Sequence, residues 1–198
     1  MTVSDTGTWE LSTGLGAIEG MTDAQAIGAS LADPEVFAVL FDRHFDAIHR
    51  YAQRRVGRDL ADEIAAETFT RAFDRRRRYD TAREDARPWL LGIAANLMRR
   101  HWRTEKRRLD AYARSTVRPG GTLTEPVAAD LAAALKALPR REREALLLLA
   151  WADLSYDQIA LALDVRIGTV RSRISRARTR LRGPDLDSYQ PREAPDNG

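Results

Sequence analysis

Residues 154–173 read Leu-Ser-Tyr-Asp-Gln-Ile-Ala-Leu-Ala-Leu-Asp-Val-Arg-Ile-Gly-Thr-Val-Arg-Ser-Arg, a stretch that predicts two helices joined by a tight turn. Ser155 and Gln158 have the spacing of a capping box, in which each side chain bonds the backbone N–H of the other at a helix start. Asp164 falls in the turn, where a left-handed backbone is needed and Asp tolerates it better than most residues. The pattern is that of a helix-turn-helix.

The helix after this turn is expected to be amphipathic. Val170, Ile174 and Ala177 recur at spacings of four and three, which places them on one face of a helix. Ala160, in the helix before the turn, is small enough to let Val170 approach closely. The opposite face suits the major groove of DNA, because arginines reach guanine edges and phosphates and serines permit close approach. Its residues are Arg171, Ser172, Arg173, Ser175, Arg176 and Arg178.

Three further helices are predicted in the N-terminal half. The sequence Asp33-Pro34-Glu35 combines an N-cap, a proline at the first helical position and an acid in the first turn. Apolar residues at helical spacing continue to Gly57, and a second such series runs from Leu60 to Phe73. Pro88 opens a third helix. No strand pattern is visible, so the expected fold class is all-α.

The chain is expected to contain two small helical domains, at residues 34–108 and 128–183. Between them, residues 109–127 include a Pro-Gly-Gly sequence and are typical of a flexible linker. Residues 1–33 hold five acidic side chains and no basic one, and are predicted to be a disordered acidic tail. Residues 184–198, acidic and rich in proline, are predicted to be a second disordered tail.

Positive charge is concentrated in two blocks, although the net charge of the chain is only +3. Residues 75–108 hold twelve basic and four acidic side chains, and residues 165–182 hold seven basic side chains and no acidic one. One such block is often only a solvated helix face. Two blocks in two domains favour a protein that contacts a polyanion at two places.

Composition excludes several classes of function. The chain has no cysteine and three histidines without metal-ligand spacing, so neither a disulfide framework nor a metal site is expected. No apolar run is long enough to span a membrane and no signal peptide is visible, which predicts a cytoplasmic protein without membrane insertion. A paired-carboxylate motif, a glycine-rich phosphate loop and a histidine-based catalytic set are all lacking. We therefore expect neither an enzyme nor a bound cofactor.

The segments 154–160 and 168–173 resemble region 4, the C-terminal DNA-binding domain of extracytoplasmic-function (ECF, group IV) RNA polymerase sigma factors. Leu-Pro-Arg-Arg-Glu-Arg-Glu-Ala-Leu at 138–146 is similar to the opening helix of that domain. The resemblance implies a domain that reads the −35 promoter element. Its implied contact residues are Arg171, Ser172, Arg173, Ser175 and Arg176.

The sequence Ala-Asp-Glu-Ile-Ala-Ala-Glu-Thr-Phe at 61–69 resembles region 2.2, the helix by which these sigma factors bind the β′ clamp of RNA polymerase. Helical spacing places Asp62, Glu63 and Glu67 on an exposed face that suits a basic partner, while Phe69 and Phe73 point to the core. The resemblance implies core RNA polymerase, at its β′ clamp and β flap, and promoter DNA as partners. An anti-sigma factor is also a common partner in this family.

Residues 88–96, from Pro-Trp-Leu to Ile-Ala-Ala-Asn, resemble regions 2.3–2.4, which read the −10 element. Reading an unpaired base requires a stacking or cavity site and a polar group for the base edge. The resemblance implies that Asn96 lies in the base pocket and that the loop 79–87 closes it, with Tyr79 as an aromatic wall. The basic residues implied to follow phosphates are Arg99, Arg100 and Arg103.

The sequence therefore predicts an alternative sigma factor that binds core RNA polymerase and directs promoter recognition and opening. The main alternative is a helix-turn-helix regulator that is not a polymerase subunit, with residues 34–108 as a sensor or dimerisation domain. Such a regulator needs neither the second basic block nor the acidic helix.

Overall fold

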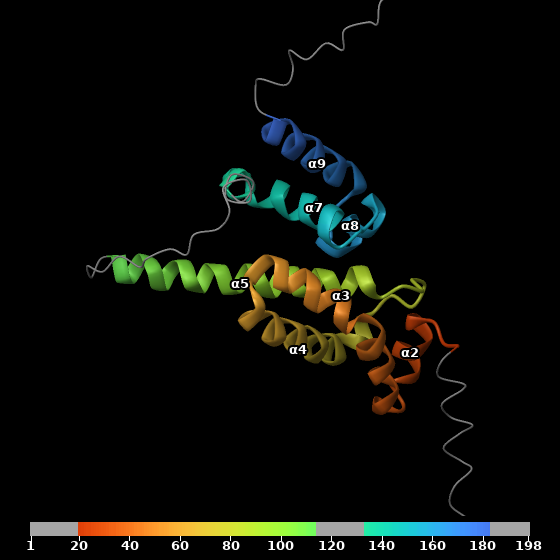
Figure 1. Ribbon diagram of the computed structural model, residues 1–198. Helices are drawn as coiled ribbons and strands as arrows, with labels where there is room; N and C mark the ends of the chain where they lie inside the picture. The colour runs from red at the N-terminus through yellow and green to blue at the C-terminus, as the bar shows by residue number, and fades with distance from the viewer. Residues whose placement is uncertain (1–19, 114–132, 183–198) are drawn as a thin grey trace, which may run out of the picture. The chain divides into compact units, whose positions relative to one another are not determined.

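The computed structural model describes the backbone of residues 20–113 and 133–182, and their side chains apart from those of 104–113. Within these ranges the secondary structure is helical and contains no strand, which confirms the all-α fold class. The chain divides into two compact units, Met1–Val117 and Arg118–Gly198. Figure 1 labels the helices of both, and each unit is described by itself.

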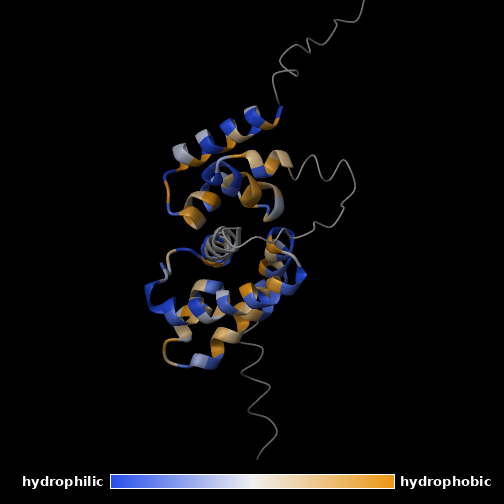
Figure 2. Ribbon diagram, turned by 90° about the vertical axis from the view of Figure 1, so that its left-hand side faces the viewer, coloured by the Kyte–Doolittle hydropathy of each residue, from blue (hydrophilic) through white to orange (hydrophobic). Residues whose placement is uncertain are grey.

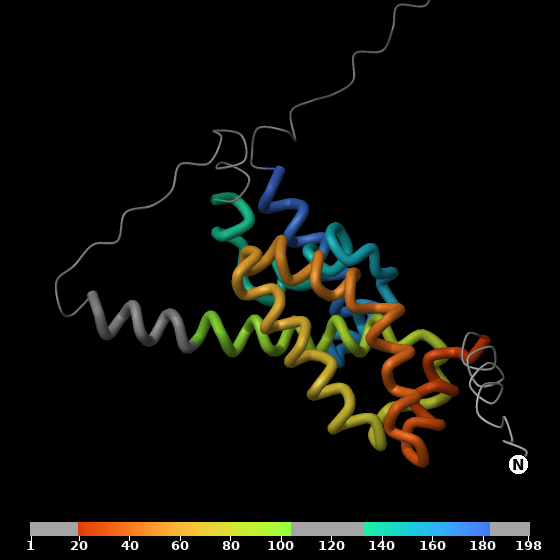
Figure 3. The backbone as a smooth tube through the Cα atoms, turned by 60° about the horizontal axis from the view of Figure 1, so that its bottom comes forward, coloured from red at the N-terminus to blue at the C-terminus, as the bar shows by residue number. Residues whose placement is uncertain are grey.

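Three long helices build the first unit: α3 (Ala38–Val56), α4 (Arg58–Arg75) and α5 (Arg87–Ala113). Each packs against the other two, and Figure 3 shows α3 and α4 forming a hairpin that lies across α5. Gly57 alone connects α3 to α4, with φ 84° and ψ 171°, a conformation that is essentially restricted to glycine. The largest fully buried side chains here are Ile27, Leu40, Ile48, Tyr51, Leu90, Leu91 and Met98.

The predicted helix start at Asp33-Pro34-Glu35 is confirmed, with one refinement. The Asp33 carboxylate accepts a hydrogen bond from the Glu35 N–H at 3.1 Å. The first turn is a 3-10 helix, η1 (Pro34–Phe37), and α3 follows it directly.

The prediction that residues 1–33 form a disordered tail is wrong for the end of that segment. Helix α2 (Asp23–Ala29) begins with a capping box, in which Thr22 and Gln25 exchange hydrogen bonds of 2.8 and 3.3 Å. Ala26 and Ile27 are fully buried, and α2 packs against α3, η1 and η2 (Arg76–Arg78). The signal was present as the Thr22–Gln25 spacing before an apolar pair, but small residues around it conceal the period. The tail residues before position 20 lie outside the described residues.

The expected boundary between the first domain and the linker is also corrected. Helix α5 continues to Ala113 and so extends into the predicted linker 109–127. Residues 109–113, Leu-Asp-Ala-Tyr-Ala, contain neither proline nor glycine, so nothing in them ends a helix that is already formed. The rest of the linker, residues 128–132 and the C-terminal tail 184–198 lie outside the described residues.

In the second unit, α7 (Arg140–Trp151) packs against α8 (Tyr156–Leu163) and α9 (Ile167–Arg182). Residues 133–137, before α7, are also helical. Figure 2 shows that hydrophobic residues lie along one side of α9 and hydrophilic residues along the other. The fully or almost fully buried side chains of this unit include Leu148, Leu154, Ile159, Val170 and Ile174.

None of the described helices is both long enough and apolar enough to cross a membrane.

Candidate nucleic-acid interface

The helix-turn-helix forms through the local contacts that its sequence predicts. The Ser155 hydroxyl accepts from the Gln158 N–H at 3.2 Å, and the Gln158 side chain accepts from the Ser155 N–H at 2.9 Å. Asp164 adopts the left-handed conformation at φ 51° and ψ 55°. The Val165 N–H then donates to the Ala160 carbonyl at 3.0 Å, which closes the turn. The predicted capping box and left-handed turn are confirmed.

Helix α9 presents a basic surface because its apolar residues are used for packing. Val170, Ile174 and Ala177 are buried, whereas the predicted contact residues on the other side have unequal exposure. Arg171, Ser175 and Arg176 are exposed, and Ser172 and Arg173 are half-buried.

Both half-buried positions have additional constraints. The Ser172 hydroxyl donates to the Thr169 carbonyl at 3.0 Å, so its hydrogen is already bonded within the helix. Burial, together with the nearby Arg141, lowers the pKa of Arg173. The Arg141 and Arg173 guanidinium groups repel each other, and an anion bound beside Arg173 would offset that repulsion.

The predicted −35 residues divide between two hollows that flank α9. One, of about 630 Å³, lies between α9 and the start of α7, and the other, of about 240 Å³, lies between α9 and the start of α8. The larger is lined by Pro139, Arg140, Arg141, Glu142, Thr169, Ser172, Arg173 and Arg176. The smaller is lined by Tyr156, Arg171, Ser175, Arg178, Thr179 and Arg182. The surface is thus a ridge with two basic flanks, as expected where residues three and four apart share a side of a helix.

The larger hollow contains basic residues that sequence reasoning did not assign. Arg140 and Arg141 open α7 and line the hollow together with Arg173 and Arg176. Their signal was the Pro-Arg-Arg sequence at 139–141, but only the packing of α7 on α9 brings it to the recognition helix. In the same place Glu142 is buried, with its Oε2 3.0 Å from the Nε of Arg180 but without hydrogen-bond alignment.

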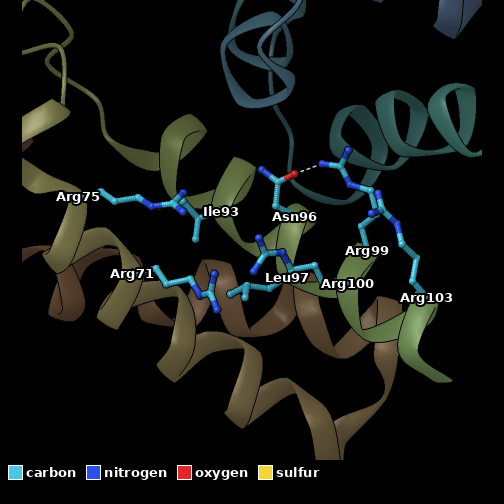
Figure 4. Close-up of a pocket in the computed structure, with 8 residues that line it drawn as sticks. All are labelled: Arg71, Arg75, Ile93, Asn96, Leu97, Arg99, Arg100 and Arg103. Atoms are coloured by element: carbon cyan, nitrogen blue, oxygen red, sulfur yellow. Dashed lines mark hydrogen bonds between the residues drawn. The ribbon is translucent and has the colours of Figure 1, made fainter. Parts of the chain in front are cut away.

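A third basic hollow, of about 200 Å³, lies between α4 and α5 in the first unit. Figure 4 shows Asn96 and Arg99 pointing toward each other, and the Arg99 guanidinium donates to Asn96 Oδ1. Asn96 is exposed, although the residues on either side of it are buried. The full lining comprises Arg71, Arg75, Ile93, Asn96, Leu97, Arg99, Arg100 and Arg103.

Four of the five predicted −10 residues line this hollow: Asn96, Arg99, Arg100 and Arg103. Sequence reasoning did not assign Arg71 and Arg75, which reach the hollow from α4. Arg71 also pairs with Glu67, with 2.5 Å between Nε and Oε1. One residue therefore links the basic hollow to the acidic residues of α4.

Tyr79 does not line the hollow as the predicted aromatic wall of a base pocket. Its side chain is buried, with a relative exposure of 9%, and its hydroxyl donates to the Arg83 carbonyl at 2.7 Å. Its ring lies 4.9 Å from that of the half-buried Trp89, and burial, reinforced by nearby carboxylates, raises the pKa of Tyr79 to about 12. The hydroxyl is thus bound to the Arg83 backbone and the buried ring packs on Trp89, so the ring does not form an exposed wall.

The predicted polymerase-binding residues are all on α4. Asp62 and Glu63 are exposed, Glu67 is half-exposed, and Asp62 Oδ1 lies 2.9 Å from His49 Nε2 of α3. Phe69 is buried, as predicted.

Aromatic side chains lie at the same junction of α3 and α4. The Phe41 side chain is 42% exposed, and its ring lies 4.7 Å from Phe45 and 5.0 Å from Phe69. The Phe45 ring also lies 5.7 Å from the ring of His49, the partner of Asp62.

Both units match known sequence families. The Sigma-70 region 2 family matches residues 40–108, and the Sigma-70 region 4 family matches residues 128–181. The ECF RNA polymerase sigma factor SigE of Mycolicibacterium smegmatis is 35% identical over 72% of this chain and 59% of its own length. The ECF RNA polymerase sigma factor EcfG of Rhodopseudomonas palustris is 31% identical over 62% of this chain and 70% of its own length.

Two solved structures have a similar fold. CnrH, determined in complex with the cytosolic domain of CnrY, has a TM-score of 0.61 at 25% identity and matches 85% of this chain and 99% of its own. The sigma factor RpoE of Bartonella quintana, in complex with the anti-sigma factor NepR, has a TM-score of 0.57 at 25% identity and matches 74% of this chain and 94% of its own. The chain belongs to the ECF RNA polymerase sigma factors, alternative sigma factors that direct transcription initiation.

Proposed function

We propose that this protein binds core RNA polymerase, recognises promoters through both units and opens them. The observation that carries the proposal is the pair of arginine-lined surfaces, one around α9 and one around Asn96, on two separate compact units. A polymerase subunit that reads two promoter elements needs such a pair. A regulator that only binds duplex DNA needs one.

In this proposal the second unit reads the −35 element as duplex DNA. Arg171 and Arg176 are exposed on opposite flanks of α9, and Ser175 between them is small enough to let the backbone approach the bases. Arg140 and Arg141 extend the larger flank with positive charge suited to phosphates.

The first unit reads the −10 element after the strands separate. Asn96 is an exposed amide whose neighbours in the hollow are arginines, so a base edge can meet the amide while its phosphates meet the guanidinium groups. Arg99 already occupies Asn96 Oδ1, so an incoming base must compete for that oxygen or bind the amide nitrogen.

Core polymerase is proposed to bind the acidic residues of α4. Asp62 and Glu63 are exposed and Glu67 is half-exposed on α4, and Phe41 of α3, a large apolar side chain, is also exposed. Charged residues that steer a partner and an aromatic residue that it can bury are a common combination at interfaces.

An anti-sigma factor is the proposed regulator. RpoE of Bartonella quintana was solved with an anti-sigma factor, and this chain shares its fold. The protein is further proposed to act in the cytoplasm as a polymerase subunit, without catalytic activity of its own.

Run-off transcription with purified core polymerase on a promoter library tests the proposal. Addition of this protein should produce discrete transcripts from a subset of templates that core polymerase alone does not use. A protein that binds DNA but yields no start sites with core polymerase would contradict it.

Charge reversal tests the polymerase contact separately. The double variant Glu63→Lys, Glu67→Lys should weaken binding to core polymerase by at least tenfold with unchanged helicity, because two attractive charges become repulsive. Asp42→Lys with Asp74→Lys makes an equal charge change at exposed positions of α3 and α4 and serves as the matched control. Equal core affinity of the two double variants would show that another surface binds polymerase.

A further inference from the structure

Helix α2 and its C-cap residue, Ser30, bind the chain at both sides of the loop 79–86, the part of the predicted loop 79–87 that precedes α5. At the far end, the Asp23 carboxylate accepts a hydrogen bond from the Ala86 N–H at 2.9 Å, immediately before α5 begins. At the near end, Arg76 in η2 donates from Nε to the Ser30 carbonyl at 3.3 Å, and its guanidinium lies 3.7 Å from the centre of the Phe73 ring. Asp23 and Ser30 thus bind residues that lie 63 and 46 positions later in the chain, one at each side of the loop.

Asp23 is itself held rigidly. It is buried, and besides the Ala86 N–H it binds Arg43 Nη1 at 3.1 Å and His44 Nε2 at 2.6 Å, both from α3. Burial alone raises the pKa of Asp23, but the hydrogen bonds from His44, Ala86 and Arg43 lower it to about 2. The carboxylate is therefore ionised at neutral pH and joins α2, α3 and the loop.

A metal site is the competing interpretation of this cluster. Asp23, His44 and Asp85 each offer a ligand atom, and these atoms lie within 4.8 Å of one another. However, both Asp23 oxygens already accept hydrogen bonds, and the Arg43 guanidinium beside them repels a cation. The contacts favour a hydrogen-bond network.

The loop between these two ends holds its own shape. The Tyr79 hydroxyl donates to the Arg83 carbonyl at 2.7 Å, and the Ala82 N–H donates to Asp80 Oδ1 at 3.2 Å. Arg83 Nε also lies 2.9 Å from Asp80 Oδ2. A loop with such internal bonds moves mainly as one body, so its two ends decide its orientation.

We propose that α2 positions the loop 79–86 for promoter opening and −10 base selection, with Asp23 as the main positioning residue. The inference rests on the proposed role of Asn96 at the −10 element and on the pocket-closing role that the family resemblance implies for this loop. Asp23 contacts no DNA in this account and acts only through the backbone of the loop.

Asp23→Asn is the first test, because it removes the charge that strengthens the bonds from His44 and Ala86 to Oδ2 and puts an amide N–H₂ or a single oxygen where Arg43 needs an acceptor. Amide exchange at Ala86 should speed up at least tenfold in the free protein. With core polymerase, discrimination among the four bases at the unpaired −10 position should fall several-fold, while binding to −35 duplex stays unchanged. Asp33→Asn is the matched control, because its carboxylate lies in the same segment but accepts from Glu35 instead of the loop.

Arg76→Met is the second test, and it covers the case in which Asp23→Asn fails to fold. Met retains packing against Phe73 while the link to Ser30 is lost, so exchange in the loop 79–86 should rise and −10 selectivity should fall. Unchanged amide exchange in both variants, or faster exchange with full −10 selectivity, would overturn the proposal.

Asn96→Ala, measured alongside, separates the two levels of inference. If that variant keeps full −10 selectivity, the proposed function of the hollow fails. The amide-exchange result, which involves no DNA, still decides whether α2 holds the loop.

Discussion

Helices α5 and α9 both carry arginines, but they place them differently. On α5 the arginines lie with Arg71 and Arg75 of α4 around one hollow that contains an exposed asparagine. On α9 they divide between two flanks of a ridge, with serine and threonine side chains in each.

The difference follows from what each helix packs against. Residues 90–98 of α5 are buried except for Asn96, so only a narrow surface remains for a ligand. Helix α9 buries a single stripe, and its other residues are exposed or half-buried. A narrow hollow with one amide suits a single extruded base, whereas a ridge with two basic flanks suits a groove between two phosphate backbones.

The largest expected effect comes from removing one core side chain in each unit. Ile174→Ala should destabilise the second unit by about 2–5 kcal/mol, and Leu90→Ala should do the same to the first, because both side chains are buried. Differential scanning calorimetry should show each substitution lowering a different transition. A shift of both transitions by either variant would mean that the units do not fold separately.

Acid should destabilise the first unit by less than the core substitutions do. The pKa of Asp23 falls from 3.8 to about 2 on folding, so its ionised form contributes about 2 kcal/mol to the stability of the first unit. This contribution is complete well above pH 3.8 and disappears as the pH falls toward 2. Urea unfolding of the wild-type protein and Asp23→Asn between pH 6 and 2.5 measures it. Parallel pH profiles of the two proteins would contradict the assignment.

The flanks of α9 should be separable by single substitutions. Arg171→Ala or Arg176→Ala should cost about 1–3 kcal/mol of −35 duplex binding if the side chain reads a guanine edge, with relaxed preference at one base pair. Because the two residues line different hollows, the base pair affected should differ. Gel-shift measurements on single-substitution −35 duplexes test this, and an equal loss on every sequence would instead indicate a phosphate contact.

The sequence predicted the parts of this fold whose determinants are local. The capping box at Ser155, the left-handed Asp164 and the helix start at Asp33 each depend on a few consecutive residues, and each is present. Helix α2 was missed because its helical period is short and set among small residues. Its stability comes from Ile27 and Asp23 packing against distant segments.

The candidate sites show the same difference between local and long-range determinants. Helical periodicity was enough to predict which residues of α9 face away from the core. It could not show that Arg140, Arg71 and Arg75 join the basic surfaces, since those contacts arise between helices. Nor could it show that the Tyr79 ring is buried, with its hydroxyl bound to the Arg83 carbonyl.

If the two basic surfaces bind different forms of DNA, Asn96→Ala and Arg176→Ala should have different defects. Both variants, with core polymerase, should be assayed by gel shift on −35 duplex and by permanganate footprinting of promoter opening. Asn96→Ala should bind the −35 duplex as the wild type does and form about tenfold less open complex, because its base is available only after unpairing. Arg176→Ala should lose duplex binding. Weakened −35 binding by Asn96→Ala, with normal opening, would contradict the account.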